Sequence, residues 1–133
     1  MKKIILWSFL LSSCLSNTNV SSFNCNQEDF LIDKENLFKI DEEKYQVLFY
    51  LDSCSACRDT KLYLNKVCNK FKIITYYLNY KDYKFADIEV QNNIKVNNYQ
   101  DIFIKTVPTL LVIYQKVVVE EYIGFNSIRN KNL

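Results

Sequence analysis

The chain has 133 residues, an apolar content of 49% and a formal net charge of +2, which indicates one folded domain and not a disordered segment. It contains no His, and this excludes His-based metal sites, Ser-His and Cys-His nucleophile pairs and imidazole acid/base catalysis. Two of its basic residues, Lys2 and Lys3, lie in the leader described next. Without them the basic and acidic residues balance, so no basic face indicates nucleic-acid binding.

Residues 1 to 13 have the pattern of a signal peptide. A positively charged start precedes the apolar run from Ile4 to Leu11, which is too short to span a bilayer because a spanning helix needs roughly 20 apolar residues. The sequence Leu11-Ser12-Ser13-Cys14 resembles the lipobox of bacterial lipoproteins. This resemblance implies cleavage before Cys14 and acylation of its thiol, which would anchor the mature chain in the lipid bilayer. Plain secretion and an uncleaved anchor are the alternatives.

We expect residues 14 to 26 to be the lipidated N-terminus with a flexible tether, because residues 15 to 25 are rich in Ser and Asn. Residues 27 to 133 are then the folded domain. An anchored protein would lie on the extracytoplasmic face of the cell membrane, and a chain without the acyl group would be secreted. Both outcomes place the domain where disulfide chemistry is active. We take Cys25, at the end of the tether, as a thiol that is free or incidentally paired.

The middle of the chain predicts a β-strand, a helix and a second strand. The apolar run from Tyr45 to Leu51 indicates a buried strand, and Cys54-Ser55-Ala56-Cys57 directly after it opens a helix. Residues 72 to 79 are rich in β-branched and aromatic side chains and predict the next strand, parallel to the first. The expected buried stripe of the helix consists of Leu64, Val67, Cys68 and Phe71. Cys68 is taken as a small buried apolar residue, with a second redox role as the alternative.

The flanking elements are less regular. The spacing of Phe30, Leu37 and Phe38 predicts a helix over part of residues 27 to 44, and one or two short helices are expected between residues 80 and 105, at 87 to 92 or 98 to 104. Residues 109 to 114 and 116 to 123 predict a β-hairpin with its turn at Gln115-Lys116. Gly124 follows and permits a positive φ or a close backbone approach. The remaining residues, 125 to 133, can form at most about two turns of helix.

Cys54 and Cys57 are the candidate catalytic residues. A Cys-x-x-Cys between a strand and a helix is typical of thiol–disulfide chemistry. A zinc site is the chemical alternative, but it would need further ligands from Cys25, Cys68 or carboxylates, with no His and no second Cys-x-x-Cys in the chain. A purely structural disulfide is the third interpretation. We therefore expect a redox pair and no bound metal.

Two motifs together resemble the thioredoxin superfamily. One runs from Val47 through the Cys-x-x-Cys to Cys57; the other is Val107-Pro108-Thr109-Leu110-Leu111-Val112-Ile113. Gly124 follows the single proline at the spacing of the hairpin in that family. The resemblance covers roughly residues 28 to 133 and implies an α/β, thioredoxin-like fold with a central mixed β-sheet and flanking helices.

The resemblance also implies roles for individual residues. Cys54 would be the attacking nucleophile and Cys57 the buried resolving thiol. Pro108 would follow a cis peptide bond beside the pair, and the backbone at Val107 would bind an extended substrate segment. The redox-active disulfide would be the only redox group, with no other cofactor. Thioredoxins proper carry a buried acid six positions before the first cysteine, a Trp directly before it and Gly-Pro between the cysteines, whereas here these positions are Leu48, Ser53 and Ser55-Ala56.

The expected function is therefore that of a membrane-tethered thiol–disulfide oxidoreductase. Its partners would be extracytoplasmic protein thiols or disulfides and a membrane electron donor or acceptor, and family analogy slightly favours reduction over oxidation. The alternative is a thioredoxin-like binding or scaffold lipoprotein with little redox turnover. Trapping of partners on Cys54 distinguishes the two hypotheses.

Overall fold

The structure is a computed structural model that describes residue 25, residues 30–82 and residues 92–131. The predicted signal peptide, the lipidation site at Cys14 and most of the helix expected at 87 to 92 lie outside these residues. Within the described ranges, no helix is both long and apolar enough to cross a membrane.

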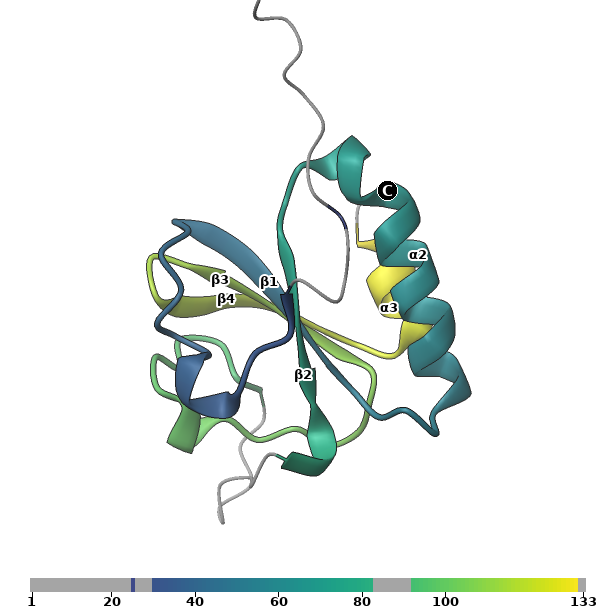
Figure 1. Cartoon of the computed structure of the whole chain (residues 1–133). Helices are drawn as coiled ribbons and strands as arrows, with labels where there is room; N and C mark the ends of the chain where they lie inside the picture. Colours follow the sequence, from purple (N-terminus) through teal and green to yellow (C-terminus); the bar gives the residue numbers. More distant parts are fainter. Residues whose placement is uncertain (1–24, 26–29, 83–91, 132–133) are drawn as a thin grey trace, which may run out of the picture.

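The domain is built on a mixed four-stranded sheet with the strand order β2-β1-β3-β4, shown in Figure 1. The central strand β1 (Lys44–Tyr50) pairs in parallel with β2 (Thr75–Asn79) and antiparallel with β3 (Thr109–Tyr114). The outer strand β4 (Val117–Ile123) pairs antiparallel with β3. These strands confirm the predicted βαβ unit and the predicted hairpin.

The two α-helices in the described part of the chain lie on the same face of the sheet. Figure 1 shows α2 (Ser55–Phe71), which connects β1 to β2, beside the short α3 (Phe125–Asn130). Alternate residues of the strands point to this face, since successive side chains of a strand point to opposite sides. The buried cluster between sheet and helices consists of Leu48, Tyr50, Cys57, Leu64, Tyr77, Leu110 and Ile128.

Irregular segments cover the other face of the sheet. Short 3-10 turns, η3 (Lys34–Asn36) and η5 (Tyr99–Asp101), belong to these segments, and a third, η4 (Tyr80–Asp82), follows β2. The apolar side chains on this side form the larger buried cluster. Its members are Leu37, Tyr45, Val47, Phe49, Leu78, Ile102, Ile104, Leu111, Ile113 and Val118.

Two predictions about helices were wrong in detail. In the described part of residues 27 to 44, helical conformation is limited to Phe30 and the 3-10 turn η3, because Leu31 lies beside Tyr77 as a single parallel bridge and the chain there is extended. Of the buried stripe predicted for α2, Leu64 is buried, whereas Val67, Cys68 and Phe71 are only half-buried. The helix buries its N-terminal half, through Cys57, Thr60 and Leu64, more deeply than its C-terminal half.

The segment that leads to Pro108 is held in place by a buried amide. The Asn93 side chain is fully buried; its Nδ2 donates to the backbone oxygen of Phe103 at 2.8 Å and to the Glu121 carboxylate at 2.7 Å. Its Oδ1 accepts from the backbone N–H of Phe103 at 2.8 Å. Because a buried amide must be hydrogen-bonded to avoid a desolvation cost, these contacts fasten the loop before β3 to β4.

Candidate active site

Strand register brings the two predicted site loops together. In the antiparallel pair of β1 and β3, Phe49 near the end of β1 lies opposite Thr109 at the start of β3. The chain that leaves β1 toward Cys54 and the chain that enters β3 through Pro108 therefore meet at the same edge of the sheet. About fifty residues of sequence separate these loops, and the register of one strand pair accounts for their proximity.

Cys54 is the N-cap residue of α2. Its backbone is extended, and the backbone N–H of Cys57 donates to its Sγ at 3.0 Å. The unpaired N–H groups and the dipole at a helix N-terminus favour negative charge at this position. A sulfur placed here is stabilised as a thiolate, which is the reactive form in thiol–disulfide exchange.

The two cysteines of the motif form a disulfide, with their Cα atoms 5.2 Å apart. Cys54 is half-buried, whereas Cys57 is fully buried in the cluster between helix and sheet. A molecule arriving from solvent can therefore reach only the first sulfur. This asymmetry matches an attacking and a resolving thiol.

The loop before β3 lies against the disulfide. The Val107-Pro108 peptide bond is cis, as the resemblance implied, and the Val107 backbone oxygen lies 3.9 Å from Cys54 Sγ. The Pro108 backbone oxygen accepts a hydrogen bond from the backbone N–H of Gly124 at 2.8 Å. Thr109 adds a bond from its Oγ1 to the Thr106 oxygen at 2.8 Å. The loop is thus held from β4 and within itself.

Apolar residues replace a buried acid behind the pair. Leu48 and Leu110 are neighbours in the strand register, and both are fully buried in the cluster that holds Cys57. The acidic residue nearer the pair in sequence, Asp52, is exposed, and its backbone oxygen accepts from Arg58 Nη1 at 3.1 Å. The site therefore has no carboxylate at the Leu48 position that could take the proton of Cys57.

A lysine lies on the same helix face as the pair. The Lys61 Nζ is 3.3 Å from the centroid of the Tyr50 ring and 6.0 Å from that of Tyr77. Burial lowers the pKa of the Lys61 ammonium below its usual value, and the charge of Asp52 opposes this shift. A cation over an aromatic face is attracted by the ring quadrupole, so the Lys61 side chain has a defined place over Tyr50, a member of the cluster that contains Cys57.

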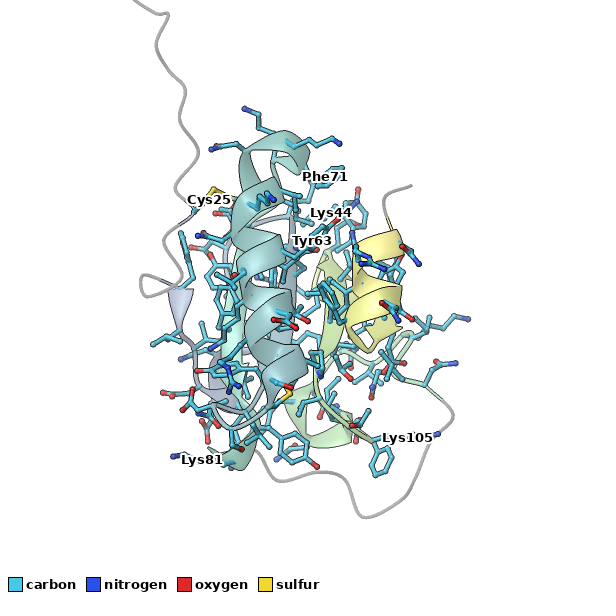
Figure 2. All side chains as sticks on the ribbon, turned by 90° about the vertical axis from the view of Figure 1, so that its right-hand side faces the viewer. Cys25, Lys44, Tyr63, Phe71, Lys81 and Lys105 are labelled. Carbon is cyan, nitrogen blue, oxygen red and sulfur yellow. A yellow bond between two sulfur atoms is a disulfide. The ribbon has the colours of Figure 1, made fainter. Side chains whose placement is uncertain are left out.

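The structure contains a second disulfide, between Cys25 and Cys68, with Cα atoms 6.0 Å apart and a sequence separation of 43. The prediction that Cys68 is a buried apolar thiol was wrong, and Cys25 has a defined partner. Figure 2 shows Cys25 beside the end of α2 that carries Phe71. Counting the cysteines could have indicated this bond: lipidation of Cys14 and pairing of Cys54 with Cys57 leave two cysteines in a disulfide-forming compartment.

The described part of the chain also bears on the zinc site considered as an alternative for the cysteines. Among residues 25, 30–82 and 92–131, no group of three or more His, Cys, Asp or Glu side chains could hold a metal ion.

Solved structures with the same architecture include thioredoxins. Thioredoxin f2 of Chlamydomonas reinhardtii superposes with a TM-score of 0.51 and 18% sequence identity, over 72% of this chain and 83% of its own. Mitochondrial thioredoxin 3 of Saccharomyces cerevisiae, in its oxidised form, gives a TM-score of 0.52 and 16% identity, over 74% of this chain and 85% of its own. The chain has the thioredoxin fold.

A third structure extends the likeness. A mutant thioredoxin from Halobacterium salinarum gives a TM-score of 0.50 and 15% identity, over 75% of this chain and 82% of its own. No protein-family model matches the sequence, and no curated protein matches it either. The thioredoxin fold is therefore recognised here through three-dimensional structure and two short motifs.

Proposed function

We propose that this protein is a membrane-tethered thiol–disulfide oxidoreductase that acts on extracytoplasmic proteins through Cys54 and Cys57. One observation carries the proposal: the half-exposed Cys54 sulfur lies at the N-terminus of α2, bonded to buried Cys57 and 3.9 Å from the Val107 oxygen. A structural disulfide needs neither an exposed sulfur at a helix N-terminus nor an adjacent cis-proline loop. The thioredoxin fold supports the same reaction class.

In the reducing direction, the exchange proceeds in two steps. The Cys54 thiolate attacks a substrate disulfide, one sulfur–sulfur bond forms to the substrate, and the displaced substrate thiolate takes a proton from solvent. Cys57 then loses its proton and attacks Cys54 Sγ, which forms the Cys54–Cys57 disulfide and releases the second substrate thiol. Two electrons pass from the pair to the substrate. Oxidation of a substrate dithiol is the reverse sequence, and no cofactor beyond the disulfide is needed.

Val107 and Pro108 are proposed to bind the substrate backbone. Val107 is half-buried and Pro108 is buried, so the loop is fixed while its backbone borders Cys54. An extended segment placed along this loop could pair with the Val107 backbone groups, as peptides do when they add to a sheet edge. Such pairing would hold a substrate sulfur near Cys54 with little dependence on the substrate's side chains.

The leader and the use of disulfides support extracytoplasmic action. The lysine pair, the apolar run and the lipobox-like sequence ending at Cys14 predict export and acylation. The Cys25–Cys68 disulfide supports the same location, because structural disulfides persist in oxidising compartments. We favour reduction of substrates over their oxidation. Reduction would be sustained by a membrane electron donor, whereas oxidation would need an acceptor. Replacing Cys14 with Ser should release the protein from membranes, and retention of that variant would contradict the tether.

The activity is tested by trapping. Full-length Cys57→Ser, first reduced and freed of reductant, is incubated with a denatured disulfide-containing protein and separated under non-reducing conditions. We expect a mixed disulfide on Cys54, because the second step is blocked, and none in the matched Cys54→Ser/Cys57→Ser variant. If Cys57→Ser traps nothing and the wild-type protein neither reduces nor forms test disulfides, the protein is a scaffold with this fold and the proposal is wrong.

A further inference from the structure

The buried thiol of the pair lacks an evident source of activation. Cys54 has the helix N-terminus and the Cys57 N–H beside its sulfur, whereas Cys57 is fully buried. Burial in apolar surroundings disfavours a thiolate. Leu48, which lies in the same cluster, cannot accept its proton. The second step of exchange nevertheless requires Cys57 as a thiolate.

Lys61 lies one helical turn beyond Cys57. Residues four apart in an α-helix are neighbours on one face, with Cβ atoms about 5–6 Å apart. Lys61 is half-buried, so water screens its charge less than that of a fully exposed lysine. The helix thus places the lysine and the buried cysteine on one face, one turn apart.

Tyrosine rings hold this cation without neutralising it. The Lys61 ammonium lies over the Tyr50 ring, and the Tyr50 and Tyr77 rings pack edge-to-face with centroids 6.5 Å apart. Both rings belong to the buried cluster that contains Cys57. A carboxylate partner would cancel the field of the ammonium, but an aromatic face leaves a net positive charge at the border of the cluster.

Other charges near this position come from three segments. Asp52, in the loop after β1, acts on Lys61 through its charge. Arg58 and Asp59 are exposed on α2. Asp33 and Lys34, of opposite sign, line a cavity of about 320 Å³ together with Tyr50 and Tyr77. Burial raises the pKa of Tyr77 to about 12, so its hydroxyl is neutral at physiological pH.

We propose that Lys61 is a positioning residue of the redox pair, which acts through Cys57 by stabilising its thiolate during the second step of exchange. The inference rests on the proposed function. Lys61 would do for Cys57 what the helix N-terminus does for Cys54, and it would replace the acid that the Leu48 position lacks. Stabilising a thiolate also stabilises the reduced form, so Lys61 would shift the pair toward the dithiol in equilibrium with glutathione.

Thiol titration tests the inference without relying on turnover. In full-length Cys54→Ser with the Cys25–Cys68 disulfide intact, the pH dependence of the Cys57 Cβ chemical shift in carbon NMR reports ionisation of this buried thiol without a reagent that must reach it. Adding Lys61→Met should raise the midpoint by about one pH unit, a tenfold lower thiolate fraction at neutral pH. Lys61→Arg, which keeps the charge, should stay near the parent. Lys66→Met, exposed on the same helix, is the matched control and should change nothing.

The outcomes separate the two proposals. A Lys61→Met midpoint equal to that of Lys66→Met would overturn the role of Lys61, and so would an Arg variant shifted as far as the Met variant. If Lys61→Met does not fold, the Arg variant must still keep the parent midpoint while 1 M salt raises the parent midpoint by roughly a few tenths of a pH unit through screening. Failure of wild-type exchange together with the expected midpoints would instead overturn the proposed function and leave the electrostatic effect standing.

Discussion

Helix α2 carries two disulfides that differ in almost every property except the bond. The Cys54–Cys57 bond joins residues with a sequence separation of 3 at the N-terminus of the helix, with one half-exposed and one buried sulfur beside a cis-proline loop. The Cys25–Cys68 bond joins residues 43 apart near the other end of the helix. It borders a small hollow lined by Phe30, Thr75 and Tyr77.

The surroundings of each disulfide determine whether it favours exchange or stabilisation. A helix N-terminus, an approach for solvent and a second thiol on the same turn favour exchange at Cys54. A long enclosed loop favours stabilisation, because a cross-link removes more conformational freedom from the unfolded chain when it joins distant residues. The first bond is expected to cycle, and the second to persist.

The largest expected effect is on exchange activity, which should depend on the Cys54–Cys57 pair and not on the Cys25–Cys68 pair. Cys54→Ser should lower exchange with a protein disulfide to the uncatalysed rate, because Cys57 is buried and cannot attack from solvent. The double variant Cys25→Ser/Cys68→Ser should keep most of the activity at temperatures where it is folded. Insulin reduction with a thiol donor measures both. Equal losses in the two variants would mean that the bonds do not have separate roles.

The free energy of unfolding should depend more on the Cys25–Cys68 bond than on the Cys54–Cys57 bond, which is the opposite of the order expected for activity. Loss of the Cys25–Cys68 disulfide should lower the free energy of unfolding by about 4 kcal/mol, which is the loop-closure estimate for a loop of this length. Cys54→Ser/Cys57→Ser should cost clearly less, since its loop is far shorter. Urea unfolding of oxidised samples gives both values. A larger loss of stability in Cys54→Ser/Cys57→Ser than in Cys25→Ser/Cys68→Ser would contradict the stabilising role of the Cys25–Cys68 bond.

Gly124 tests the support of the proline loop. Its φ of 89° and ψ of 154° are accessible almost only to glycine, while an added Cβ would meet no atom within 4 Å. Gly124→Ala should therefore cost about 2 kcal/mol through backbone strain alone, and it should weaken the hold on Pro108. Ser127→Ala, an exposed change on α3, is the control and should stay within about 0.5 kcal/mol. Unchanged stability of Gly124→Ala in urea unfolding would show that the loop relaxes freely.

Tyr77 shares a buried cluster with Cys57 and lines a hollow with Cys25 and Cys68, and its ionisation should lower the stability of the domain at alkaline pH. Burial raises its pKa to about 12 from the ordinary 10, so the folded state resists ionisation that the unfolded state accepts. The stability from neutral Tyr77 is complete below pH 10 and is lost as the pH rises through about 12. The free energy of unfolding falls between about pH 8 and about pH 11.5, and in Tyr77→Phe this fall should be about 2 kcal/mol smaller than in the wild-type protein. Urea unfolding of both proteins at the two pH values measures the difference, and equal losses would contradict the role of buried Tyr77.

The elements that one local pattern determines could be predicted from the sequence. The apolar run of β1, the Cys-x-x-Cys and the Pro-Thr strand each have a strong short-range pattern, and the positive φ values of Gln115 and Lys116 suit the predicted two-residue turn. From these, the central strands, the hairpin and the meeting of Cys54 with Pro108 could be predicted.

The features that depend on residues distant in the sequence could not be predicted. Phe30 and Leu37 fit a helix by spacing, but the bridge of Leu31 to β2 keeps the backbone extended there. The partner of Cys68 lies 43 residues away, and no local pattern of α2 distinguishes a paired thiol from a buried one. The position of Lys61 over Tyr50 depends on how α2 packs on the sheet, which periodicity alone does not give.

The Cys25–Cys68 bond also sets how far Cys25 lies from the reactive end of the domain. Cys68 lies thirteen residues beyond Ser55 along α2, a rise of roughly 20 Å at about 1.5 Å per residue. Cys25 is fastened at that far end of the helix (Figure 2). In a chain anchored through Cys14, as we propose, the tether would join the domain about one helix length away from Cys54. Soluble partners could then approach the sulfur without crossing the headgroup layer.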